Sequence, residues 1–127
     1  MNVPKGHQVV MPYLMVNGAL AFIEFVRQVF NGELTTNMHR LREDGVTVMH
    51  SEITISGCTI MFSDATEQWK AQTANLFVYV ENADATFKKA IESGATTLMP
   101  LSDQDYGRTC GVTDRFGNVW WITSIQK

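Results

Sequence analysis

The sequence predicts an α+β fold, because it reads as two copies of one unit with the order strand, helix and three strands. The stretch 110–122 contains a tight turn between two apolar strands, and the earlier stretch 56–63 repeats part of that pattern. When the glycines of the two turns are aligned, neighbouring residues pair in order: Gly57 with Gly117, Ile60 with Trp120, and Met61 with Trp121.

The passages from strand to helix repeat as well. Residues 13–17 (YLMVN) resemble residues 76–82 (LFVYVEN), and each stretch precedes a helix-like segment that ends at a glycine, Gly32 or Gly94. Similarity on this scale indicates two supersecondary units that bury a core together. Within a single domain over 1–127, we expect module 1 over about 9–63, a linker over 64–73 and module 2 over about 74–124.

Length, composition and charge limit the class of protein and the partners that it could bind. With 127 residues, 45% of them hydrophobic and 18% charged, the chain suits a folded soluble protein. The net charge of −3 and the lack of a basic run argue against a nucleic-acid partner. Residues 1–7 match neither a signal peptide nor a membrane span, so we expect a frayed arm on a cytoplasmic protein with no membrane partner. Cys58 and Cys110 predict two reduced, buried thiols, with a disulfide as the alternative.

The first predicted strand covers residues 9–16, and Asn17 is a suitable N-cap for a helix over about 18–30. The polar residues of this helix form a narrow stripe, so its apolar arc is wider than one sheet contact requires. Two interpretations remain open: the helix packs deeply on its own sheet, or part of the arc meets a second subunit.

Residues 34–42 and 46–56 predict a hairpin around the turn Asp44-Gly45, followed by a fourth strand over 58–63. In that register four polar side chains share one face of the hairpin: Asn37, His39, His50 and Glu52. A His–Glu pair can transfer protons, and two histidines with a carboxylate can bind a metal ion. The third interpretation is a polar edge strand with solvated histidines.

Module 2 is predicted to repeat this order. A strand over 76–80 leads to a helix that starts at Asn82, and strands over 96–100, about 108–113 and 119–123 follow. The polar segment 101–107 predicts an extended loop over a cleft, with Tyr106 in a mobile lid. Arg108 is either an anion contact or a solvated arginine.

Strand alternation sets the two adjacent tryptophans apart. Neighbouring strand residues point to opposite faces, so Trp120 and Trp121 cannot both enter one core. The side chain that faces away from the helix layer is the candidate for function.

The chain resembles the vicinal oxygen chelate superfamily, which has the glyoxalase, bleomycin-resistance and dioxygenase fold, and within it the PhnB-like branch. The matching stretches are Pro12-Tyr13-Leu14, Met49-His50-Ser51-Glu52, Ile60-Met61-Phe62-Ser63-Asp64 and Asp114-x-Phe116-Gly117-x-x-Trp120. The resemblance implies an eight-stranded, U-shaped mixed sheet around a cleft, and a homodimer.

The resemblance also implies where a divalent metal would be held. Enzymes of the superfamily use four His, Glu or Gln ligands, and the matching places here hold Met11, Met61, Asn75 and Trp121. Two thioethers, an amide and an indole are not the donors that such ions require. We therefore expect no metal ion. The sequence also lacks the glycine-rich strand-to-helix loop that would bind a methyl-donor cofactor, so we expect no other cofactor.

Two functions remain open. The first is a small-molecule-binding protein whose ligand contacts an apolar cleft and its surroundings: Met11, Met61, Asn75, Trp121, Tyr106, Arg108 and His39. The second is a lyase, isomerase or dioxygenase type of enzyme in which His50 and Glu52 act as an acid–base pair or as partial metal ligands.

Overall fold

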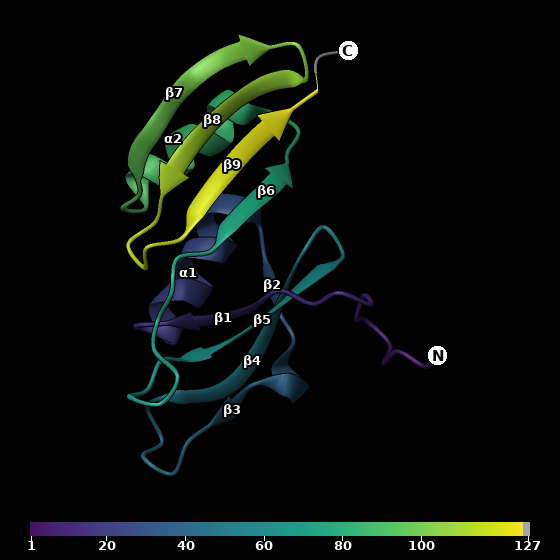
Figure 1. Ribbon diagram of the computed structural model, residues 1–127, viewed down its shortest axis with the longest axis vertical. Helices are drawn as coiled ribbons and strands as arrows, with labels where there is room; N and C mark the ends of the chain where they lie inside the picture. Colours follow the sequence, from purple (N-terminus) through teal and green to yellow (C-terminus); the bar gives the residue numbers. More distant parts are fainter. Residues whose placement is uncertain (126–127) are drawn as a thin grey trace. The chain divides into compact units, whose positions relative to one another are not determined.

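Two sheets, one of five strands and one of four, account for the nine strands that the computed structural model shows in residues 1–125, the part of the chain that it describes (Figure 1). The chain divides into two units. Unit 1 contains Met1–Arg27 and Asn31–Gln72, and unit 2 contains Gln28–Phe30 and the chain from Thr73 onward. The predicted α+β class and the repeated order of strand, helix and strands are confirmed.

Unit 1 holds the five-stranded sheet, in the order β1-β5-β4-β2 with β3 also paired to β4. Only the β1–β5 pair in it is parallel. The elements are β1 (Tyr13–Val16), α1 (Ala19–Phe30), β2 (Glu33–Leu34), the 3-10 helix η1 (Thr36–Met38), β3 (Arg40–Leu41), β4 (Val48–Ile55) and β5 (Cys58–Asp64).

One face of this sheet forms the core of unit 1. Leu14, Ile53 and Phe62 are buried there, and the ring of Phe22 from α1 meets that of Phe62 edge-on at 5.1 Å. Each such side chain contributes about 1.5–3 kcal/mol by leaving water. Because side chains alternate, the residues between them point to the opposite face, which we call the open face. The predicted apolar arc of α1 is largely buried, with Leu20 as its exposed member.

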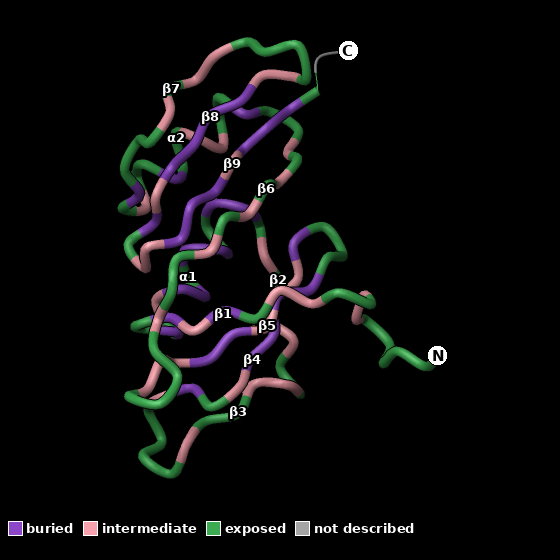
Figure 2. Tube along the Cα trace, viewed as in Figure 1, coloured by how far each residue is buried: buried purple, intermediate pink, exposed green. Residues whose placement is uncertain are grey.

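Unit 2 holds the four-stranded sheet, in the order β6-β9-β8-β7, with β6 and β9 parallel. Its elements are β6 (Asn75–Tyr79), α2 (Ala83–Glu92), β7 (Thr96–Gln104), β8 (Gly107–Thr113) and β9 (Val119–Ser124). Burial is concentrated in the two central strands, β8 and β9, as Figure 2 shows. No helix among residues 1–125 has both the length and the apolar character that a membrane span requires.

The turn between β8 and β9 has the predicted form. Asp114 accepts hydrogen bonds from the backbone N–H groups of Phe116 and Asn118, and Gly117 has a φ of 88°. The second carboxylate oxygen of Asp114 accepts from Trp120 Nε1 at 2.8 Å. Trp120 is 1% exposed and lies against Phe30, with ring centroids 4.6 Å apart. The predicted separation of Trp120 from Trp121 is therefore confirmed.

The same strand position caps the helix in each unit. In unit 1 the Asp64 carboxylate accepts from the N–H groups of Gly18 and Ala19, and in unit 2 the Ser124 hydroxyl accepts from that of Ala83. The predicted capping of α1 by Asn17 is wrong, because the cap comes from the end of β5 instead. The prediction that α2 is capped by Asn82 is confirmed, since its side chain accepts from Ala85 N.

Two other predictions are corrected. Strand β7 continues through Pro100 to Gln104, so 101–107 is not an extended loop. Proline is tolerated because β7 is an edge strand whose pairing with β8 shifts register on both sides of Met99. Both cysteines are free, as predicted, but Cys58 is exposed rather than buried.

Candidate functional site

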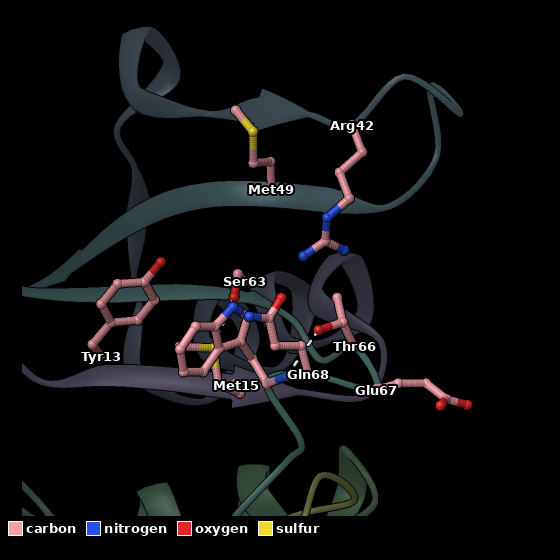
Figure 3. Close-up of a pocket in the computed structure, with 9 residues that line it drawn as sticks. Tyr13, Met15, Arg42, Met49, Ser63, Thr66, Glu67 and Gln68 are labelled. Atoms are coloured by element: carbon pink, nitrogen blue, oxygen red, sulfur yellow. Dashed lines mark hydrogen bonds between the residues drawn. The ribbon is translucent and has the colours of Figure 1, made fainter.

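The open face of unit 1 carries a hollow of about 720 Å³. The parallel pairing sets Tyr13 opposite Met61 and Met15 opposite Ser63, so these four side chains share that face. The hollow is lined by Tyr13, Met15, Arg42, Met49, Ser63 and Trp69, among others (Figure 3). Its lining combines thioethers and aromatic rings with a guanidinium group, as is typical of small-molecule sites.

A β-bulge in β4 places Met49 in the lining of this hollow. Leu41 pairs with Val48 and Arg40 pairs with His50, so Met49 is the extra residue on its strand. Without the bulge, Met49 would share the buried face of Ser51 and Ile53, but it is exposed, and its neighbour Val48 is fully buried instead.

The bulge also overturns the predicted face shared by four polar side chains. It pairs His50 with Arg40, and His39 turns to the buried Ser51, whose Oγ lies 2.9 Å from its Nδ1. Asn37 lies in the short helix η1. His39 and Asn37 therefore do not join His50 and Glu52, because the hairpin keeps its predicted register only next to the turn.

His7, from the N-terminal arm, contacts Glu52 on the face where His39 was expected. Glu52 is 2% exposed, and its two carboxylate oxygens lie 2.7 Å from His7 Nε2 and 3.0 Å from His50 Nε2. The ring of Tyr13 meets His50 edge-on at 5.8 Å. We call His7, Glu52 and His50 the imidazole–carboxylate cluster.

The carboxylate of this cluster is held in its ionised form. Burial favours the neutral acid, but the hydrogen bonds with His50 and His7 outweigh it and lower the pKa of Glu52. A carboxylate bonded to Nε2 of an imidazole fixes the orientation and tautomer of the ring, which is how general bases are positioned. The arrangement is therefore suited to proton transfer.

The arm that carries His7 is bound to the sheet rather than frayed. The side-chain amide of Gln8 both donates to and accepts from the backbone of Thr59, and the Thr59 hydroxyl donates to the carbonyl of Gly6. No sequence pattern identifies His7 as a site residue, because these contacts join residues far apart in the chain. Nor does one identify Arg42, since a hairpin arginine is ordinarily solvated.

The open face of unit 2 is aromatic. Trp121 is half-buried there, opposite Phe77 and Gly111, and its Nε1 donates to Asn75 Oδ1 at 3.1 Å. Phe77 also lies near Tyr79 and Tyr106, with ring centroids 5.3 and 6.4 Å away. Of the residues expected to bind ligand, Asn75, Trp121 and Tyr106 thus come together on this surface.

Arg108 does not join them. It pairs with Ser124 on the face that carries Trp120, and its guanidinium binds both oxygens of Asp84 in α2, at 2.9 and 3.1 Å. The ion pair raises the pKa of Arg108 and lowers that of Asp84. A guanidinium engaged in this way is a poor anion contact, which argues against the predicted role.

The places that correspond to the metal ligands do not fit a divalent ion. The repeated strand pairing, Tyr13 with Met61 and Phe77 with Trp121, shows that the two units match in register. Neither Met61 nor Trp121 offers an oxygen or imidazole donor, and the amide oxygen of Asn75 accepts from Trp121. Within residues 1–125, no three His, Cys, Asp or Glu side chains are arranged to hold a metal ion.

Solved structures with this fold come from several bacteria. A PhnB protein from Bacillus cereus superposes with a TM-score of 0.71 at 21% identity, over 92% of this chain and 99% of that one. TnmS3, an antibiotic binding protein from Streptomyces, superposes with a TM-score of 0.71 at 15% identity, over 99% of both chains.

Sequence comparison gives the family. An uncharacterised protein of Mycobacterium bovis is 29% identical over 121 residues, which covers 86% of this chain and 78% of that protein. The model of the Glyoxalase/Bleomycin resistance protein/Dioxygenase superfamily matches residues 7–122, nearly all of both βαβββ units. With the fold, the register of its repeat and this match in agreement, the chain belongs to the glyoxalase/bleomycin resistance protein/dioxygenase superfamily.

Proposed function

We propose that this protein binds a small aromatic molecule in an apolar cleft lined by Met and Trp, at places where metal enzymes of the superfamily carry their ligands. The observation that carries the proposal is the position of Trp121. Its indole lies on the open face, half-buried and oriented by Asn75, with the ring of Phe77 on the paired strand. An indole fixed in this way offers a flat surface on which an aromatic ring gains about 0.5–1.5 kcal/mol beyond area burial.

The matching places of unit 1 hold two thioethers. Met11 and Met61 belong to the first unit, where Met61 stands opposite Tyr13 as Trp121 stands opposite Phe77. Thioethers adapt to ligands of different shapes. The likeness to TnmS3, an antibiotic binding protein, supports a role in binding a drug or metabolite.

We further propose that the protein acts in the cytoplasm as a homodimer. Phe77 and Tyr79 are 51% and 65% exposed on the edge strand β6, where a second subunit would cover them and form one side of the Trp121 site. The ligand would then be held without a metal ion or other cofactor.

A thermal-shift screen of small aromatic compounds tests the binding function, because a ligand of the folded state raises its stability by RT ln(1 + [L]/Kd). Trp121→Ala should abolish the shift given by a neutral aromatic hit, and Trp121→Phe should retain part of it, since the ring surface remains. Elemental analysis after native purification should show no stoichiometric zinc, nickel, iron or manganese. One metal per chain, or neutral aromatic hits that all ignore Trp121, would contradict the proposal.

The imidazole–carboxylate cluster supports a second candidate, an enzyme in which His50 transfers a proton and Glu52 orients it. If a turnover is found, His50→Ala should lower it about 10²–10⁴-fold. His39→Ala is the matched control, because His39 contacts Ser51 and not Glu52. An equal effect of both substitutions would assign the histidines a structural role.

A further inference from the structure

The hollow on the open face of unit 1 has a wall that the sequence did not predict, formed by the linker after β5. Thr66 and Trp69 close a tight turn, since Thr66 N donates to Trp69 O and Trp69 N donates to the Thr66 hydroxyl, each at 2.9 Å. This turn holds the Trp69 indole, which is 60% exposed, at the edge of the hollow. A large aromatic side chain fixed in an otherwise polar linker offers a ring surface to a ligand.

The hollow also contains the positive charge of Arg42, which forms no ion pair with a carboxylate of residues 1–125. One N–H of the Arg42 guanidinium donates to the backbone carbonyl of Asp64 at 2.9 Å. A guanidinium has five N–H donors in a planar fork. Figure 3 shows this guanidinium group pointing toward Ser63 and Thr66, which also line the hollow.

The carboxylates of Asp64 and Asp44 are bound to backbone N–H groups, and Asp44 interacts with Arg42 through charge without an ion pair or hydrogen bond. The Asp64 carboxylate accepts from the backbone N–H groups of Gly18, Ala19 and Val48, and the Asp44 carboxylate from those of Val46 and Thr47. Glu67 is the acidic residue in the lining, but it is exposed, and its side chain extends away from Arg42 in Figure 3. The remaining donors of Arg42 are therefore available to an anion from solution.

We propose that this hollow binds a small aromatic carboxylate. The ring lies among Met15, Tyr13 and Trp69, and the carboxylate takes the fork of Arg42, with the Ser63 hydroxyl as a further donor. That hydroxyl now points at the sulfur of Met15, 3.0 Å away, which is a weak acceptor that an anion would displace. The inference goes beyond the proposed binding function, because the lining of this hollow does not include Trp121, and it adds acidic aromatic compounds as a second ligand class.

Binding of 2-naphthoate and of its neutral isostere naphthalene-2-carboxamide, measured by isothermal titration calorimetry, tests this assignment. The acid should bind more tightly than the amide. Arg42→Gln should weaken binding of the acid about tenfold or more, because it removes a charge-assisted pair of hydrogen bonds, and should change binding of the amide less than about twofold. Arg40→Gln makes the same change in charge on the same hairpin outside the hollow, and it should leave both affinities unchanged.

Further variants distinguish loss of binding in the hollow from misfolding of the variant and from binding at another site. If Arg42→Gln does not fold, Arg42→Lys keeps the charge without the fork and should still weaken the acid selectively. Trp69→Leu should weaken both probes. The assignment is overturned if Arg42→Gln acts no more strongly than Arg40→Gln, if the amide binds as tightly as the acid, or if no naphthoate binds at about 1 mM. Neutral aromatics that depend on Trp121 would then leave the proposed binding function standing.

Discussion

The six-membered ring of Trp121 lies directly over Gly111, so closely that a Cβ at Gly111 would be 2.6 Å from Cζ3 and 2.9 Å from Cε3 of the indole. The two residues are cross-strand partners in β9 and β8. Only a residue without a side chain leaves room for the ring in this position. The glycine thus sets the orientation of the proposed ligand platform.

Gly111→Ala should displace the Trp121 ring and break its hydrogen bond to Asn75. We expect the affinity for any neutral aromatic ligand found by thermal shift to fall about tenfold, which corresponds to roughly 1.4 kcal/mol. Tryptophan fluorescence should change in the free protein, because the indole becomes more hydrated. Unchanged fluorescence together with unchanged affinity would show that the strands adjust and that Gly111 does not set the platform.

Trp120→Ala and Trp121→Ala should give opposite phenotypes. Trp120 is buried against Phe30 and donates to Asp114, so its truncation should lower the free energy of unfolding by roughly 3–5 kcal/mol. Trp121 is half-buried on the open face, so its truncation should weaken ligand binding at least about tenfold while the protein stays folded. Urea unfolding and ligand titration measure the two effects, and exchanged phenotypes would contradict the face assignment.

The comparison of these tryptophans with the hairpin shows what the sequence could and could not predict. Alternation along β9 is a local rule, and it separated Trp120 from Trp121 correctly. The bulge at Met49 depends on how β3 and β4 pair, and a single extra residue moved His39 to the other face. The contact between His7 and Glu52 joins an arm to a strand 45 residues away, and no local pattern signals it.

The same limit applies to helix capping. Asn82 was identified because it precedes its own helix, whereas Asp64 caps α1 from the far end of β5. N-cap preferences describe hydrogen bonds between residues that are close in sequence, and tertiary contacts can replace those bonds. By contrast, the donor and acceptor groups of the predicted cleft residues follow from the residue types alone. Their burial and contacts could be learned only from the structure.

Asp64→Ala should destabilise the protein more than Ser124→Ala, its counterpart in the other unit. The Asp64 carboxylate serves Gly18 N, Ala19 N and Val48 N, so its loss should lower the free energy of unfolding by at least about 2 kcal/mol. Ser124 serves Ala83 N, and its loss should lower that energy by about 1 kcal/mol. Chemical denaturation of the two variants makes the comparison, and a larger effect of Ser124→Ala would contradict the account.

The imidazole–carboxylate cluster should make stability depend on acidic pH. The pKa of Glu52 is lower in the folded protein than its ordinary value of about 4.3, so the ionised carboxylate stabilises the fold above that pH. This contribution should be lost as the pH falls through the folded pKa of Glu52. The stability difference between the wild type and Glu52→Gln, measured by urea unfolding, should therefore be full above about pH 4.3 and shrink as the pH falls further below that value. A difference that stays constant as the solution is acidified would contradict the shift.

The exposed aromatic face of unit 2 should bury itself in a homodimer. Phe77 and Tyr79 expose more than half of their surface, and Tyr106 lies beside Phe77. In a monomer these rings would form a contiguous aromatic patch exposed to solvent. An obligate interface of this kind should bury more than roughly 2,000 Å² in total. We expect a dimer by analytical ultracentrifugation at micromolar concentration, and Phe77→Glu should produce monomers because the charge would be desolvated at the interface. Ile91→Glu introduces the same charge at a partly exposed apolar site in α2 and should leave the dimer intact. A wild-type monomer, or equal dissociation by both substitutions, would show that this face is not the interface.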